Sequence, residues 1–197
     1  MIRRAAMRLH GVAAARTGAI AIFACAIATM GSAAAGPSED VDRMLVTYRS
    51  IHSMRVHATV PGASWNIEYE APNRYKVDSN RFNAVVIGDD AWTLQRRGWK
   101  HMPPGTGRAI LEKLDVYRAI FLTGGTYDYR ITDRGVTPGV GHQYEFRRSI
   151  VRADHGWVWV RPDNLPSQVH KSSGSWAYFT DFNLYNDIHP PAGATEI

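Results

Sequence analysis

The residues after residue 35 that we consider first for chemistry are seven scattered histidines and the adjacent carboxylates Asp89 and Asp90. The histidines are His52, His57, His101, His142, His155, His170 and His189. None of them belongs to an H-x-H or H-E-x-x-H pattern, so the sequence predicts no metal site. Asp89 and Asp90 follow Gly88 directly, and aspartate in that position is typical of a tight turn rather than of a catalytic pair.

Motifs of nucleophilic catalysis and of nucleotide binding are absent from the sequence. There is no G-x-S-x-G, and Gly105-Thr106-Gly107 is followed by Arg108 instead of the lysine of a phosphate-binding loop. We therefore expect a protein that is not an enzyme and that carries no cofactor. A catalytic triad assembled from distant positions remains open at this point.

Aromatic residues are the abundant feature of residues 36–197, with six Trp, nine Tyr and five Phe. Many stand at alternate positions of expected strands, so they share faces. One interpretation is ordinary core packing, and the other is a wall for an apolar ligand. As that wall we predict Trp65, Tyr69, Tyr75, Ile87, Trp92, Leu94, Trp157 and Trp159.

The formal net charge of +5 belongs mainly to the N-terminal segment. Residues 1–35 hold four of the 23 basic residues, all of them arginine, and none of the 18 acidic residues, which leaves the rest at +1. A nearly neutral body argues against nucleic acid as a partner, and also against aromatic stacking on bases.

Residues 1–35 have the pattern of a secretory signal peptide. Arginines are followed by the short apolar run 19–28, and Ala33-Ala34-Ala35 suits cleavage before Gly36. We expect an exported, periplasmic protein in which residues 36–197 form a single domain. The alternatives are an uncleaved membrane anchor and a lipid anchor at Cys25, the sole cysteine, which we rank lower because Phe23 fits a lipobox poorly.

Two amphipathic helices and about ten strands are expected in residues 36–197. One helix is predicted from an N-cap at Ser38 to near Ser53, and a second over 110–121 with Leu114, Tyr117 and Phe121 on its apolar side. Alternation and turn residues predict strands at 54–60, 64–71, 75–77, 83–87, 91–97, 127–132, 143–151, 157–161, 167–171 and 175–184. The fold class is a mainly β, half-open and strongly curved antiparallel barrel.

Four ordered landmarks carry a family resemblance. Residues 71–77 (APNRYKV) are similar to R-P-x-x-[FY]-x-[WV], and 85–94 to the hairpin [IL]-[IV]-x-D-G-x-x-[LW]-[WY]. Residues 157–169 resemble a strand–G-L-P–strand element, and 186–193 resemble the ending F-x-x-x-P-P-x-G. Together with the helix predicted directly after residues 1–35, they resemble the LolA/LolB-like family of lipoprotein-localisation factors.

The resemblance implies a half-open barrel with two or three helices as a lid over an apolar cavity. It also implies acyl chains of lipoproteins, or lipids, as the ligand, and a membrane-associated donor or acceptor protein as partner. Leu114, Tyr117 and Phe121 are then lid residues. Ala71 stands where the family's carriers commonly have arginine.

Three functions follow from these expectations. The first is a monomeric periplasmic carrier or binder of a hydrophobic moiety, for example in outer-membrane lipoprotein sorting. The second is an envelope-stress sensor that uses the same fold for protein interaction. The third is an enzyme acting on a lipid-like substrate, which requires a polar dyad, for example around His57 or Asp181, facing the cavity.

Overall fold

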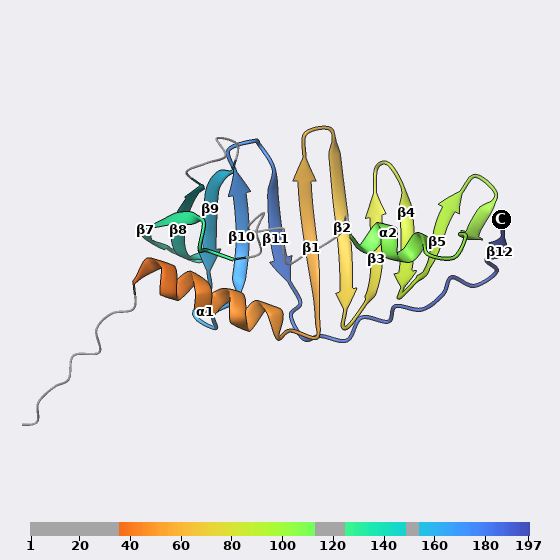
Figure 1. The fold of residues 1–197 in the computed structure, drawn as a ribbon, viewed down its shortest axis with the longest axis horizontal. Coiled ribbons are helices and arrows are strands. Elements are labelled where there is room, and N and C mark those ends of the chain that lie inside the picture. Colours follow the sequence, from red (N-terminus) through yellow and green to blue (C-terminus); the bar gives the residue numbers. More distant parts are fainter. Residues whose placement is uncertain (1–35, 113–124, 149–153) are drawn as a thin grey trace, which may run out of the picture. The chain divides into compact units, whose positions relative to one another are not determined.

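A single open sheet of twelve strands dominates the computed structural model, which describes residues 36–112, 125–148 and 154–197 (Figure 1). The strand order is β12-β6-β5-β4-β3-β2-β1-β11-β10-β9-β8-β7. Strands β7 and β12 are edges, so the curved sheet does not close into a barrel. The mainly β, half-open architecture predicted from the sequence is confirmed, with twelve strands where about ten were expected.

The sheet consists of two meanders joined by one long-range pair. Consecutive strands pair from β1 to β6 and again from β7 to β11, and β1 pairs with β11. Every pair is antiparallel except β12 with β6. The strands are β1 (Ser53–Val60), β2 (Ala63–Glu70), β3 (Arg74–Ser79), β4 (Asn83–Ile87), β5 (Asp90–Gln95), β6 (Gly98–His101), β7 (Tyr129–Thr137), β8 (Gly141–Arg148), β9 (His155–Val160), β10 (Pro166–Lys171), β11 (Trp176–Thr180) and β12 (Thr195–Glu196).

Helix α1 (Pro37–Arg49) begins one residue before the predicted cap and ends before the predicted end. The N-cap is Gly36 rather than Ser38, because proline is favoured at the first helical position and Pro37 occupies it. The backbone N–H of Gly36 donates to Glu39 Oε2 at 3.2 Å. Val41, Met44, Leu45 and Tyr48 form the buried stripe of the helix.

The buried stripe of α1 defines the two faces of the sheet. It belongs to one hydrophobic cluster with Met54 and Val56 of β1 and with Ile67 of β2. We call this side the core face and the opposite side the outer face. Because successive side chains of a strand alternate between faces, the register assigns every other strand residue to one face or the other.

Helix α2 (Thr106–Leu111) begins earlier than the helix predicted over 110–121. It lies on the same side of the sheet as α1 (Figure 1), and Ile110 and Leu111 pack against the core cluster. The backbone N–H of Gly107 donates to Asp89 O at 3.0 Å, and Arg108 donates to the Asp89 carboxylate at 2.9 Å. The predicted lid residues Leu114, Tyr117 and Phe121 lie outside the described residues.

The C-terminal segment follows the ends of the strands from β11 to the far edge of the sheet (Figure 1). The buried side chain of Asn186 donates to the carbonyl oxygens of Met54 and Tyr69 at 3.3 and 3.0 Å. Arg74 donates to the carbonyl oxygen of Ile188 at 3.0 Å. These bonds attach the segment to β1, β2 and β3 before it adds β12 to β6.

The attachment of β12 is expected to weaken as the pH rises above about 6.5, the ordinary pKa of histidine. His101 Nδ1 lies 2.9 Å from Glu196 Oε1, and Nε2 lies 3.2 Å from Asp90 Oδ1. Hydrogen bonding to Glu196 raises the pKa of His101; burial opposes this with a smaller effect, and the bond to Asp90 adds a further, still smaller, increase. The stabilisation is therefore complete below the unfolded-state pKa of about 6.5 and is lost as the pH passes the higher folded-state pKa.

This prediction can be tested by NMR titration of the His101 ring together with amide exchange at Thr195 and Glu196. Glu196→Gln is expected to lower the pKa of His101 and to speed exchange at neutral pH. A His101 pKa that Glu196→Gln leaves unchanged would contradict the assignment.

Gly156 in β9 is expected to tolerate no side chain. Its register partner in β8 is Phe146, and an added Cβ would overlap the carbonyl oxygen of His170 and lie 2.9 Å from the Phe146 ring. Gly156→Ala should lower the free energy of unfolding by about 2–3 kcal/mol through overpacking. Gly36→Ala is the control, with no atom within 4 Å and an expected cost below about 1 kcal/mol. Equal denaturation midpoints for the two variants would refute the prediction.

Candidate functional site

An apolar pocket of about 300 Å³ lies on the core face, where β1 and β10 end and β11 begins. Small side chains meet there, because the register places Ala58 and Val169 on either side of Ala177. A larger residue on any of these three strands would fill the space. We call this the open-face pocket; its lining is Ala58, Val60, Val169, Lys171, Ser175, Trp176 and Ala177.

Lys171 gives the open-face pocket one charged border, and its ammonium is held in place by a buried carboxylate. Lys171 Nζ lies 3.1 Å from Asp154 Oδ1, with the two side chains 16% and 2% exposed. The Tyr129 hydroxyl donates to the other Asp154 oxygen, and Tyr129 itself packs edge-on against Phe146. An ammonium has three donors, so Lys171 keeps donors for a polar group at the mouth of the pocket.

The eight predicted wall residues do not share one face. Trp65, Tyr69 and Tyr75 lie on the core face: the two tyrosines are buried in the core cluster, and Trp65 packs against it. Trp65 is the register partner of Ala58, so it flanks the open-face pocket. The other five lie on the outer face by register: Ile87, Trp92, Leu94, Trp157 and Trp159.

Ala71 follows β2, and its backbone N–H donates to His52 O at 2.7 Å. Its side chain packs against the core cluster. At this position, where the family's carriers commonly have arginine, the uncharged side chain of Ala71 is part of the apolar packing.

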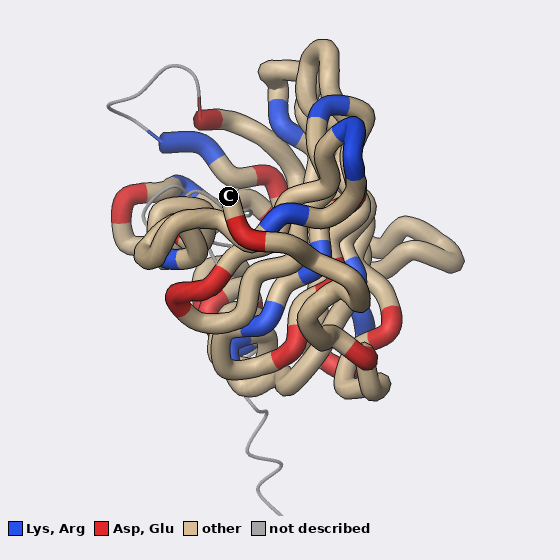
Figure 2. The backbone as a smooth tube through the Cα atoms, turned by 90° about the vertical axis from the view of Figure 1, so that its right-hand side faces the viewer, with Lys and Arg blue, Asp and Glu red and all other residues tan. Residues whose placement is uncertain are grey.

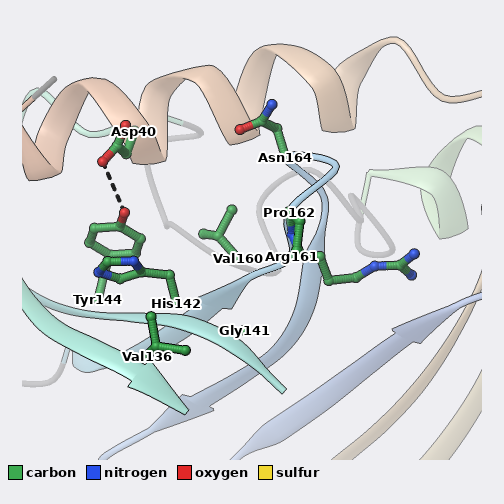
Figure 3. A pocket seen from close by; sticks show the side chains of 9 residues that line it. All are labelled: Asp40, Val136, Gly141, His142, Tyr144, Val160, Arg161, Pro162 and Asn164. Carbon is green, nitrogen blue, oxygen red and sulfur yellow. Dashed lines mark hydrogen bonds between the residues drawn. The ribbon is translucent and has the colours of Figure 1, made fainter. Parts of the chain in front are cut away.

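A second pocket, of about 310 Å³, lies between α1 and the strands β7 to β9 (Figure 3). Val136 and Val160 give it apolar sides, and the Tyr144 hydroxyl donates to Asp40 Oδ2 of α1 at 3.0 Å. Burial, followed by this bond to Asp40, raises the pKa of Tyr144 well above its usual range. The bond attaches the first turn of α1 to β8.

One residue of the second pocket, His142, pairs with a carboxylate outside its lining, that of Asp133. The His142 ring stacks on Tyr144 at 4.7 Å, and His142 Nε2 lies 2.7 Å from Asp133 Oδ1. The hydrogen bond from His142, and then that from the Gly135 N–H, lowers the pKa of Asp133. Among the described residues that line this pocket none is serine, threonine or cysteine, and its one hydroxyl, that of Tyr144, is bonded to Asp40.

The dyad residues named for an enzyme lie elsewhere. His57 lies on the outer face and hydrogen-bonds Asn66 Oδ1 at 2.5 Å, and Asp181 pairs with Arg55 at 3.2 Å in an exposed position. Neither residue lines the open-face pocket or the second pocket.

The described residues carry positive and negative charges in a mixed distribution. Basic and acidic positions are interspersed along the backbone when the sheet is viewed from its β12 end (Figure 2). Within residues 36–112, 125–148 and 154–197, no group of three or more His, Cys, Asp or Glu side chains is arranged to hold a metal ion. No helix in that part of the chain is long and apolar enough to cross a membrane.

Sequence reasoning missed the residues that shape the open-face pocket because it searched for large rings. The available signal was the opposite one, small residues at alternate strand positions, as in Ala58 and Ala177. Asp154 and Lys171 carry no local motif, since the pairing depends on β9 and β10 lying side by side.

An open, curved antiparallel sheet with helices and an apolar pocket on one face defines the structural class. No family model matches the sequence, and no curated protein matches it either. The fold is found in crystal structures of two mycobacterial proteins. The lipoprotein LppX of Mycobacterium tuberculosis aligns over 76% of this chain and 96% of its own, with 14% identity and a TM-score of 0.54.

LprF from Mycobacterium bovis aligns over 81% of this chain and 100% of its own, with 14% identity and a TM-score of 0.50. At this identity the likeness shows a common fold and nothing more. A LolA superfamily protein from Nitrosomonas europaea aligns over 77% of this chain and 95% of its own at 12% identity. Its TM-score of 0.31 is too low for any argument.

Proposed function

We propose that the protein binds the hydrophobic part of an amphiphilic molecule in the open-face pocket and carries it in the cell envelope. The observation that carries the proposal is the composition of that pocket. Small aliphatic side chains from three adjacent strands form its floor, and Lys171 is the one charged residue among the described residues that line it. An apolar pocket with a single oriented polar group is the usual design of a site for such ligands.

The size of the pocket favours a chain over a bulky ring system. About 300 Å³ is at the small end of the range for ligand sites. Ten buried methylenes would contribute about 8 kcal/mol before the costs of association. The Lys171 ammonium would then donate to an ester, carboxylate or phosphate oxygen at the end of the chain.

The proposed export, domain organisation and cargo are supported by the signal-peptide pattern of residues 1–35 and by the comparisons with known structures. Residues 1–35 would direct export, residues 36–197 would act as one binding domain, and the acyl chains of a lipoprotein or a membrane lipid would be the cargo. LppX is described as a lipoprotein, and the common fold is consistent with work at the envelope. A membrane-associated donor or acceptor would load and unload the carrier.

Mass spectrometry of the protein purified from the producing cell's envelope tests the proposal. The intact mass distinguishes a chain starting at Gly36 from one that keeps residues 25–35 with a lipid on Cys25. Solvent extraction of the native protein is expected to release a stoichiometric lipid or acylated peptide. An empty protein that also fails to take up a fluorescent fatty acid would refute the binding function.

A further inference from the structure

Three arginines converge on the outer face beside the β7 edge. A polar hollow of about 250 Å³ is lined there by Arg130, Thr132, Arg134, Glu145 and Arg147. Thr132 lies opposite Glu145 in the pairing of β7 with β8, and Arg130 lies opposite Arg147. We call Arg130, Arg134 and Arg147 the arginine cluster. It is separate from both pockets of the core face.

The arginine cluster has more positive charge than its surroundings neutralise. Of the described residues, Glu145 is the one carboxylate that lines the hollow, and it already accepts from Arg134 and from His155 Nε2 at 2.8 Å. These partners lower the pKa of Glu145, with Arg134 as the larger cause. Arg147 reaches the same carboxylate only at 3.6 Å.

Arg130 has no ion pair with any residue of the described ranges and faces Arg147 directly across the strand pair. Like charges at such positions destabilise a sheet. An oxyanion placed between the two guanidinium groups would remove the repulsion, and the forked donors of arginine suit phosphate oxygens.

An aromatic stripe continues from the arginine cluster across the same face. Trp157 lies opposite Glu145 in the register and contacts His155 at 4.9 Å. Further along, Trp176 contacts Tyr178 at 4.9 Å, and Tyr178 is 40% exposed. The stripe consists of His155, Trp157, Trp159, His170, Trp176, Tyr178 and His57. The ring centroids of its contacting pairs lie 4.9–6.1 Å apart, and Trp159 is its buried member, with 8% of the residue exposed.

We propose that the outer face of β7–β11 docks onto a bilayer surface that contains anionic phospholipid. Lipid phosphates occupy the arginine cluster, and the exposed edges of the Trp and Tyr rings sit at headgroup level, where these amphipathic rings are favoured. A soluble phosphate ion would use the arginine cluster alone. The continuity of the cluster with partly exposed Trp and Tyr rings therefore favours a membrane. The inference does not depend on what the open-face pocket binds.

Binding of the full mature chain to vesicles tests this docking. One set of vesicles contains phosphatidylglycerol mixed with phosphatidylcholine, and the other contains phosphatidylcholine alone. The protein is expected to bind the first set, in a way that added salt weakens, and to bind the second far less. Arg130→Gln with Arg147→Gln should weaken binding about 25-fold, from about five-fold per arginine.

The matched control is Arg96→Gln with Arg97→Gln, which removes the same charge from the exposed β5–β6 turn and should change binding less than two-fold. Tyr178→Ser also removes the ring contact with Trp176, so it should lower the thermal unfolding midpoint slightly, and it should weaken binding several-fold at a temperature where the variant is fully folded. The variant with both Arg130→Gln and Arg147→Gln should keep its thermal unfolding midpoint near that of the parent protein, which checks that the fold is intact.

Three outcomes would overturn the proposal. One is the absence of binding to anionic vesicles. Another is an equal loss in the cluster and control variants, which would mean attraction by net charge alone. The third is a parent protein that binds inorganic phosphate but does not bind vesicles, together with a cluster variant that has lost phosphate binding. The hollow would then be a site for a free ion.

Discussion

Replacing Asp154 with alanine is expected to lower the free energy of unfolding by about 3–5 kcal/mol, the usual cost of removing one partner of a buried ion pair. The Asp154 side chain is 2% exposed and accepts from both Lys171 and the Tyr129 hydroxyl. Without it, a nearly buried ammonium and a buried hydroxyl lose their common partner. Urea denaturation of the two proteins gives the difference directly.

Asp163→Ala is the control for this loss. Asp163 pairs with Arg161 at 2.8 Å, but both side chains are more than 40% exposed, so removal should cost at most about 1 kcal/mol. Adding Lys171→Met to Asp154→Ala should recover part of the lost stability, because the uncompensated charge is removed as well. An Asp154→Ala protein as stable as the Asp163→Ala protein would show that the pair is not buried in solution.

Filling the open-face pocket should abolish most of the binding of a fluorescent fatty acid. In Ala58→Phe, the new ring would project from β1 towards Ala177 and occupy the space of several methylenes. If three methylenes are displaced at about 0.8 kcal/mol each, the affinity falls about 50-fold. Fluorescence titration of the two folded proteins measures the ratio.

Thr59→Phe provides the matched comparison. It adds the same ring to the adjacent position of β1, on the outer face opposite Trp176. Its affinity should stay within two-fold of the parent protein. If Ala58→Phe binds the fatty acid as tightly as Thr59→Phe, the ligand must lie elsewhere. The second pocket, between α1 and β7 to β9, would then be the next one to block by substitution.

The strands were predictable where side chains alternate and turns are marked by glycine or proline. Strand β4 was found with its bounds at 83–87, and β2 was displaced by one residue, because both lie between clear turn signals. Strands β6 and β12 were missed. Two residues of β12 show no alternation, and its parallel pairing with β6 depends on the path of the C-terminal segment rather than on local sequence.

The site was less predictable than the fold because alternation does not say which face is covered. Trp65 and Trp157 stand in equally regular patterns, but the position of α1 places the first on the core face and the second on the outer face. That choice depends on long-range packing.

The pairing of β1 with β11 determines when the sheet can be completed. Each meander contains only neighbouring strands and can form from local contacts, whereas the pair that includes Val56 and Phe179 must wait for almost the whole chain. Until then β1 is an open edge with unpaired backbone groups, which invites association with other chains. During N-to-C synthesis the first meander therefore passes through an aggregation-prone interval that ends only when one of the last strands has emerged.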